Sequence, residues 1–356
     1  IILLSLIGFL DFAAEIGITI SLTLFLCQIF SANHRSLIFS KNYKSKINSI
    51  IQFRFFVSIL IVLISGIVIF QLQFQNFLFL ILLSTLICTQ WIAEIFLTIK
   101  EKQKKNELLN YLLLTNILFI IVITLFIFLN NLSVINIIMV IMIMNYFLTF
   151  NKDFRKFKID LKNLKLVSYI LKSSLNKFEI ISSFSLNFSN LIWRFSILIL
   201  AGKSIAGLLF GSYALGSFFG TLYSNIVAPK IHSKKIFFPK LLLIFLAPFV
   251  LIIFYYAIKN FENFEYINDL NSSRLACIFF SLIGSYFMLV SLIIRFNYFY
   301  HVSTIFIFKL DVLYSVLISL LISIIFVSLG LKYLVMAYLF ASLSSLLVYS
   351  LIFLKS

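Results

Sequence analysis

Residues 133–150 read SVINIIMVIMIMNYFLTF, a stretch that contains no charged side chain. The hydrocarbon core of a bilayer is about 30 Å thick, and a helix crosses it with roughly 20 apolar residues. The apolar residues here are continuous and do not alternate with polar ones, as they would in the strands of a membrane barrel. The stretch therefore predicts a membrane-spanning helix.

Runs of the same kind recur along the whole chain. Hydrophobic residues make up 62% of the 356 positions and charged residues only 12%, whereas about a quarter of the residues in a soluble domain are charged. We therefore predict an all-α polytopic membrane protein with about eleven spans. Their approximate ranges are residues 1–30, 51–70, 77–98, 108–129, 133–150, 178–201, 205–228, 241–258, 275–294, 306–329 and 333–354.

The loops between these runs alternate in charge. The loops at residues 35–46, 100–105 and 152–165 are rich in lysine and arginine, whereas the intervening loops carry few basic residues. Because basic loops stay on the cytoplasmic side, the pattern supports the predicted number of spans and predicts a cytoplasmic C-terminus. Contact of these loops with anionic lipid headgroups accounts for the net charge of +17, without any role in nucleic-acid binding.

A polar stripe runs along the predicted span at residues 178–201. Its members are Glu179, Ser183, Asn187, Asn190 and Arg194. At 100° per residue they fall within an arc of about 80°, and a polar stripe in lipid must face other helices or a hydrated cavity. We predict a substrate site in which Arg194 binds an anionic group, such as the phosphates of a lipid carrier. The alternative is that Arg194 pairs with Glu179, or with an acid of another helix, and only holds the bundle together.

Two carboxylates lie one helical turn apart in the first predicted span. They belong to Asp11 and Glu15. Paired acids inside a membrane can take up H⁺ or Na⁺ and so couple ion entry to transport. We predict an ion-coupling site here; the alternative is that Asp11 lies at the outer headgroups and only Glu15 is buried.

The other charged or metal-ligating side chains predict no further site. Glu94, and Lys309 with Asp311, lie near the cytoplasmic ends of predicted spans, where snorkelling or local pairing explains them. The three cysteines are widely spaced within apolar runs, which favours neither a metal cluster nor a disulfide framework. We therefore expect no metal and no cofactor other than a coupling H⁺ or Na⁺.

Small residues recur at every fourth position in the span at residues 205–228. They are Ser212, Gly216, Gly220 and Ser224. Such a ridge lets helix backbones approach closely and slide past each other, as a moving bundle requires. Static tight packing is the alternative.

Three stretches resemble the Wzx-type flippases, which belong to the multidrug/oligosaccharidyl-lipid/polysaccharide exporter superfamily. One is the last predicted span, whose small residues Ala337, Ala341 and Ser342 are compatible with the family but not specific to it. LIGFLDFAAEIGITISLTLFLCQIF, from Leu6, is similar to the second helix of the family. NLIWRFSILILAGKSIAGLLFGSYALGSFFGTLYSNIVAPKI, from Asn190, is similar to its seventh and eighth helices, with Arg194 and Tyr213 retained. Trp193 stands where the family commonly has an acid, which departs from its pattern.

The resemblance implies twelve helices in two six-helix lobes around a central cavity. The lobes would comprise residues 1–150 and 166–356, joined by a basic cytoplasmic linker at residues 151–165. Ile1 lies inside an apolar run, so we expect that the true N-terminus and the first helix are missing. The chain would lie in the inner (plasma) membrane.

The implied activity is transport of lipid-linked (undecaprenyl-pyrophosphate) oligosaccharide units for O-antigen or polysaccharide biosynthesis, not catalysis. A polysaccharide polymerase and a chain-length regulator would be partners, together with membrane lipids. Two alternatives remain open: a cation-coupled drug or metabolite antiporter of the same superfamily, and a membrane polysaccharide polymerase. A polymerase is disfavoured because the longest outer loop, residues 259–274, is short and contains no histidine.

Overall fold

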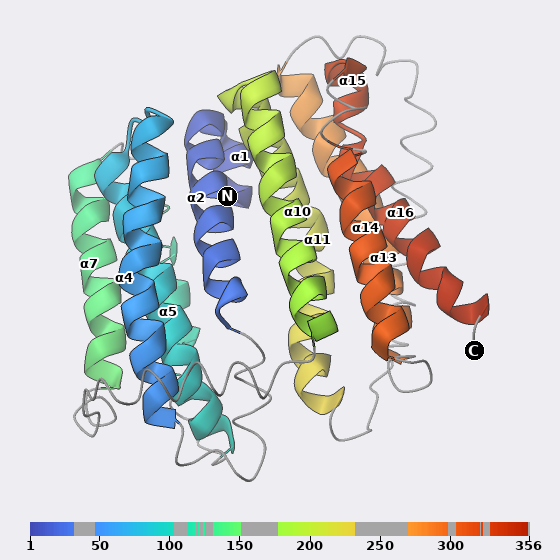
Figure 1. The fold of residues 1–356 in the computed structure, drawn as a ribbon. Coiled ribbons are helices and arrows are strands. Elements are labelled where there is room, and N and C mark those ends of the chain that lie inside the picture. Colours follow the sequence, from blue (N-terminus) through green and yellow to red (C-terminus); the bar gives the residue numbers. More distant parts are fainter. Residues whose placement is uncertain are drawn as a thin grey trace. The chain divides into compact units, whose positions relative to one another are not determined.

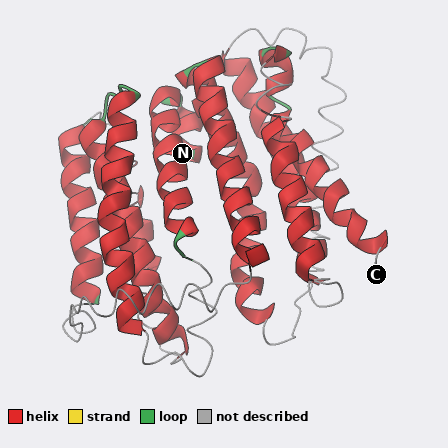
Figure 2. Ribbon diagram, in the orientation of Figure 1, coloured by secondary structure: helices red, strands yellow, loops and turns green. Residues whose placement is uncertain are grey.

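The computed structural model describes residues 1–31, 47–102, 131–150, 177–231, 270–297, 304–320 and 328–354, with scattered positions between 111 and 124 and position 322. Nearly all of these residues are helical, and none of them forms a strand (Figure 2). The all-α prediction is confirmed for this part of the chain.

Contacts between the helices divide the chain into two compact units. Unit 1 comprises Ile1–Ile18 and Ile181–Ser356, and unit 2 comprises Thr19–Ile180. These limits differ from those of the expected lobes, because the first residues of the chain cluster with the C-terminal part. The expected linker at residues 151–165 lies outside the described residues. The two-lobe arrangement stays a prediction.

Unit 2 is a helical bundle. It contains the second part of α2 (Leu10–Ile29), α4 (Ile47–Gln71), α5 (Phe77–Lys102) and α7 (Leu132–Thr149) (Figure 1). Helix α5 packs against both α4 and α7. The Thr23 hydroxyl lies 3.0 Å from that of Ser84 and 3.4 Å from that of Ser65, so small hydroxyl side chains join α2, α4 and α5 by hydrogen bonds within apolar surroundings.

The outer face of α4 is apolar. It exposes large hydrophobic side chains along most of its length, namely Phe55, Phe56, Ile59, Leu60, Leu63, Ile64, Ile67 and Phe70. A contiguous apolar face of this length is rare on soluble proteins. It is the surface that a helix presents to lipid, so it supports a membrane location.

Unit 1 contains the remaining helices. They are α1 (Ile2–Ile7), the first part of α2, most of α10 (Lys177–Ala201), α11 (Lys203–Ile231), α13 (Leu270–Asn297), α14 (Thr304–Leu320), α15 (Leu331–Leu334), α16 (Ala337–Ser350) and the 3-10 helix η4 (Leu351–Leu354). Helix α13 packs against α11 and α16, and α16 also packs against α14 (Figure 1). The functional residues discussed below lie on this framework.

The start of the chain approaches α11 very closely. A Cβ atom at Gly207 would overlap the backbone carbonyl of Leu10, and one at Gly211 would overlap the side chain of Ser5. The Ser5 hydroxyl donates a hydrogen bond to the Gly207 carbonyl oxygen (2.8 Å). Because glycine has no Cβ atom, the beginning of α2 can pack directly against α11.

Large side chains of neighbouring helices pack against the small residues of α11. The predicted sliding ridge would place backbone against backbone, but at Gly216 the ring of Tyr338 from α16 occupies the space that a Cβ atom would need. At Gly220 a Cβ atom would lie 2.7 Å from Leu292 Cδ1 of α13. Interlocked side chains of this kind fit the alternative of static packing.

Six helices among the described residues are long and apolar enough to cross a membrane. They are Leu10–Ile29, Ile47–Gln71, Phe77–Lys100, Leu132–Thr149, Phe184–Ala201 and Ala276–Phe296. These helices indicate a membrane-embedded protein and match six of the predicted spans. The first is shorter than predicted, because Gly8, with a φ of 108°, ends α1 before α2 begins.

The predicted count of about eleven spans is too high for the residues that the structure describes. Residues 241–258 lie outside them, and only scattered positions of 108–129 are described. Residues 205–228 are helical within α11, but not all of their side chains are described, and α11 is not among the six. Residues 306–329 are described as a helix only to Leu320, and residues 333–354 are interrupted before α16, which has 14 residues.

Candidate functional site

Helix α10 has three distinct faces in unit 1. Its packed face carries Ser189 and Trp193, and the Ser189 hydroxyl donates to the Ser315 carbonyl oxygen of α14 (2.6 Å). Its apolar face exposes Phe184, Phe188 and Ile192, as the pattern of the polar stripe predicts for the opposite side. The centre of the polar stripe lies about 120° around the helix from Ser189, on a third face that is neither packed nor apolar.

The structure describes three of the five side chains in the polar stripe. Asn190 is exposed, and Asn187 and Arg194 are half-buried. Asn190 also accepts a hydrogen bond from the Trp193 indole N–H (3.4 Å). Glu179 and Ser183 belong to α10, but their side chains lie outside the described part.

Arg194 is held by a backbone oxygen and by aromatic rings. Its Nη1 donates to the carbonyl oxygen of Gly17 in α2 (3.1 Å). Its Cζ lies 5.3 Å from the ring centre of Trp193 and 5.5 Å from that of Phe210, which is within the range of cation–π attraction. The alternative pairing with Glu179 is wrong for one helix, because fifteen residues at 1.5 Å each separate their Cα atoms by about 22 Å.

The turn at Gly202 places two polar side chains of α11 next to the acidic residues of α2. With a φ of 84° it forms a one-residue turn between α10 and α11, a conformation that favours glycine. Lys203 and Ser204 follow at once in the first turn of α11. The Lys203 ammonium lies 3.2 Å from a carboxylate oxygen of Glu15, and the Ser204 hydroxyl donates to Asp11 (2.5 Å).

The two carboxylates differ in burial. Glu15 is 2% exposed, whereas Asp11 is exposed. This matches the alternative in which only the deeper acid is buried. Lys203 belongs to α11, which also packs against α1 at the start of the chain.

These contacts form one polar track along α2. Asp11, Glu15 and the Gly17 carbonyl, which are spread over about 9 Å of helix, contact Ser204, Lys203 and Arg194 respectively. The predicted ion-coupling and substrate-binding groups therefore meet within unit 1, a proximity that the sequence does not predict. Positive and negative groups alternate on the track, so it can receive an anion at Arg194 and exchange a cation at Glu15.

A second charged network joins α13, α14 and α16 in unit 1. Arg295 donates two hydrogen bonds to the two carboxylate oxygens of Asp311, each 2.8 Å long, and the Tyr349 hydroxyl donates to the same carboxylate (2.6 Å). Asp311 is thus paired, but with residues of two other helices and not with Lys309, which is exposed. Arg295 lies in the last turn of α13.

Unit 2 contains a further buried arginine that the sequence analysis missed. Arg54 of α4 is 1% exposed, and its Nη1 lies 2.9 Å from a carboxylate oxygen of Glu94. The same nitrogen donates to the Trp91 carbonyl oxygen, and the guanidinium lies over the Trp91 ring, 4.7 Å from its centre. The expectation of local pairing for Glu94 is confirmed. The sequence signal for this buried arginine is the presence of two polar residues, Gln52 and Arg54, near the start of an apolar run.

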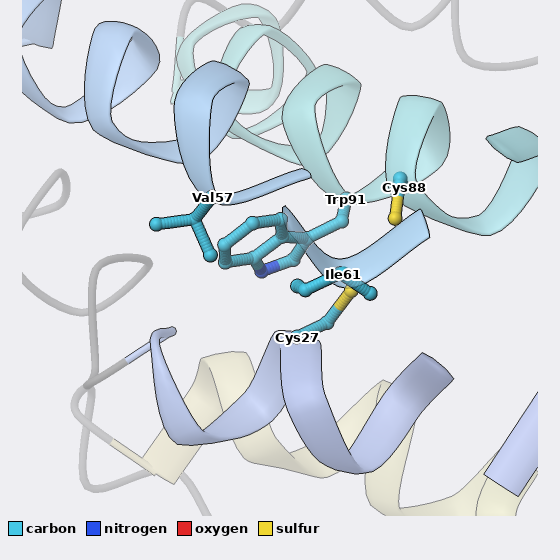
Figure 3. Packing of buried hydrophobic residues seen from close by; sticks show 5 residues of the cluster. All are labelled: Cys27, Val57, Ile61, Cys88 and Trp91. Carbon is cyan, nitrogen blue, oxygen red and sulfur yellow. The ribbon is translucent and has the colours of Figure 1, made fainter. Parts of the chain in front are cut away.

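Two of the cysteines lie in one buried cluster of unit 2. Cys27 and Cys88 pack with Val57, Ile61 and Trp91 between α2, α4 and α5 (Figure 3). Both thiols are free, as is the buried Cys277 of unit 1. Among the described residues no group of three or more His, Cys, Asp or Glu side chains could hold a metal ion.

Compared with known proteins, the chain matches no family model, no curated protein and no solved structure. The observations that bear on function are therefore the polar track and the stretches quoted above.

Proposed function

We propose that the chain is a flippase that moves lipid-linked oligosaccharide units, carried on undecaprenyl pyrophosphate, across the inner membrane. The observation that carries this proposal is the position of Arg194. It is a half-buried guanidinium on an apolar helix, fixed by a carbonyl oxygen and two aromatic rings, with the exposed Asn190 one turn away. A fixed cation and amide beside each other suit a pyrophosphate group and the sugar attached to it.

In this proposal the substrate head group binds to Arg194, Asn187 and Asn190, with Ser183 and Glu179 further along the same stripe. Twelve helices would form two six-helix lobes around a central cavity, with the C-terminus in the cytoplasm. Rocking of the lobes would expose the head group on the outer side, while the lipid tail stays in the bilayer. Partner enzymes on that side, a polymerase and a chain-length regulator, would then use the transported unit.

Glu15 and Asp11 provide the ion coupling in this proposal. In this proposal a coupling H⁺ or Na⁺ that binds to Glu15 would compete with Lys203 for the carboxylate and so weaken their 3.2 Å contact. Because Lys203 follows Arg194 through a one-residue turn, loss of this contact would act on the helix pair that carries the substrate site.

The central experiment is complementation in a strain from which the gene has been deleted. We expect undecaprenyl-linked units to accumulate on the inner leaflet and wild-type protein to restore surface polysaccharide. Arg194→Ala should abolish restoration, because it removes the cation that binds the head group, and the variant should still be present in the membrane fraction. Phe188→Leu is the matched control, since it changes an exposed apolar residue of the same helix.

Two outcomes would contradict the proposal. If linked units reach the outer side normally in the deletion strain, the chain is not their flippase. If Arg194→Ala restores polysaccharide fully, Arg194 does not bind the substrate.

The contact between Glu15 and Lys203 also suits a second candidate, a cation-coupled antiporter for drugs or metabolites. The two candidates share the fold and differ in substrate. Increased sensitivity of the deletion strain to amphiphilic drugs, with normal polysaccharide, would favour the antiporter.

A further inference from the structure

Four serine side chains lie between α10 and α14 in unit 1. Ser185 and Ser189 are one helical turn apart on α10, as are Ser315 and Ser319 on α14. The hydroxyls of Ser185 and Ser315 are hydrogen-bonded to each other, and the Ser189 hydroxyl lies 2.8 Å from that of Ser319. Because the residue numbers of the partners rise together, the two helices run in the same direction. We call these four residues the serine seam.

The serine seam has an apolar edge and a polar one. Successive residues of a helix are 100° apart, so in two parallel helices the residue before each α10 serine and the residue after each α14 serine lie on the same side of the contact. These residues form an exposed apolar edge, namely Phe184, Phe188, Val316 and Leu320. Asn190, which follows Ser189, lies on the other side, in the polar stripe. Where α10 faces α14, the serine seam therefore separates the apolar edge from the polar stripe.

The hydroxyls on α14 have partners on their own helix as well as on α10. The Ser315 hydroxyl also donates to the Val312 carbonyl oxygen (2.8 Å), and the Ser319 hydroxyl to the Ser315 carbonyl oxygen (3.1 Å). A serine of α10 can likewise turn its hydroxyl to the carbonyl oxygen one turn before it. Every hydroxyl of the serine seam therefore keeps a partner when the helices separate, as a polar group in lipid requires.

Charged and aromatic contacts hold the helices on either side of the serine seam. The pair of Arg295 and Asp311 joins α14 to α13, and its rupture would leave a buried charge uncompensated. Trp193 packs against aromatic rings of α11, at the end of α10 that carries Arg194. Hydrogen bonds between neutral side chains contribute little in a membrane, because the separated helices find other partners. At the serine seam α10 can thus part from α14 while these contacts persist.

We propose that the serine seam opens as a lateral gate for the isoprenoid tail of the substrate. This inference rests on the proposed transport function and adds the path of the lipid to the site of the head group. The charged head group binds to the polar stripe, whereas the apolar tail stays in lipid. A substrate bound at the stripe reaches the apolar edge between α10 and α14 once the gate is open. Opening exchanges hydrogen bonds between the helices for bonds within each helix.

A cross-link between the two helices tests the gate. In a chain whose three cysteines are replaced by alanine, Ser189→Cys and Ser319→Cys are combined and oxidised to a disulfide with copper phenanthroline in cells of the deletion strain. We expect the disulfide to stop the formation of new surface polysaccharide, and dithiothreitol to restore it. Ser291→Cys with Ser345→Cys is the matched control. These hydroxyls are also 2.8 Å apart but join α13 to α16, so their disulfide should leave transport unchanged.

Spin labels on the apolar edge give a readout that does not depend on transport. Labels at Phe188→Cys and Val316→Cys, both at exposed positions, report the distance between α10 and α14 by pulsed electron paramagnetic resonance. The full chain in detergent is measured alone, with farnesyl pyrophosphate and with inorganic pyrophosphate. Farnesyl pyrophosphate should add a longer distance between the labels. Inorganic pyrophosphate should not, because it has no tail.

Three results would overturn the inference. They are failure of Ser189→Cys and Ser319→Cys to form a disulfide, a control disulfide that blocks transport as strongly as theirs, and a label distance that farnesyl pyrophosphate does not change. If the disulfide between α10 and α14 leaves transport intact while Arg194→Ala abolishes it, the proposed function survives and the gate fails. If the labels separate but the deletion strain transports linked units normally, the gate stands and the flippase proposal fails.

Discussion

Replacing Asp311 with alanine would leave the Arg295 guanidinium without the carboxylate that holds it between α13, α14 and α16. Asp311 is 0% exposed and accepts two bonds of 2.8 Å from Arg295 and one of 2.6 Å from Tyr349. Removing one partner of a buried ion pair costs about 3–5 kcal/mol, because the remaining charge is buried without compensation. We expect the free energy of unfolding to fall by about this amount. Tyr349→Phe, which removes a single bond to a charged group, should cost about 1.5–3 kcal/mol.

The measurement is equilibrium unfolding of the purified protein by sodium dodecyl sulfate in mixed micelles, followed by helix content. Lys309→Ala is the control, because this exposed charge lies on the same helix and should change stability by only about 0.5 kcal/mol. The double variant Arg295→Met with Asp311→Leu should be more stable than Asp311→Ala, since it removes both charges at once. A loss of less than about 1 kcal/mol in Asp311→Ala, or a double variant no more stable than the single one, would refute this reasoning.

Two further predictions test the packing of the units. Gly207→Ala should clearly lower the thermal stability, because its Cβ atom would overlap the Leu10 carbonyl. Gly66→Ala is the control and should be neutral or stabilise by up to about 1 kcal/mol, since the nearest atom to its Cβ is 3.8 Å away. Equal effects of the two substitutions in differential scanning fluorimetry would contradict the close approach of Leu10 to α11. In a Cys277→Ala variant, Cys27 and Cys88 should be joined by dibromobimane in the membrane, as a shared buried cluster requires, and mass spectrometry of the peptides should detect the link; its absence would contradict the packing of α2 against α5.

The helices themselves follow largely from the sequence, because length and apolar composition decide whether a segment can cross a bilayer. The uncharged run that becomes α7 is predicted almost to the residue. The errors arise where a helix ends without a strong local signal. Residues 333–354 read as one apolar run, but α15 ends at Leu334 and α16 begins at Ala337 with no proline or glycine between them. Packing, and not local preference, places that interruption.

The candidate site is less predictable than the helices. The stripe on α10 is visible from spacing alone, since its members share one face. Its partners are not, because Gly17 and Arg194 lie 177 positions apart in the chain, and Glu15 and Lys203 lie 188 apart. Lys203 also looks like an ordinary loop lysine until Gly202 is recognised as the whole of the turn.

The turn at Gly202 also has a consequence for biogenesis. A connection of one residue leaves no segment that could stay behind in water, so we expect α10 and α11 to be inserted together as a helical hairpin. Insertion of the hairpin would therefore fix both the side of the membrane on which Lys203 lies and the depth of Arg194 in the membrane. An epitope inserted at position 202 would separate the two arms of the hairpin, and with them the charges that α2 depends on during assembly.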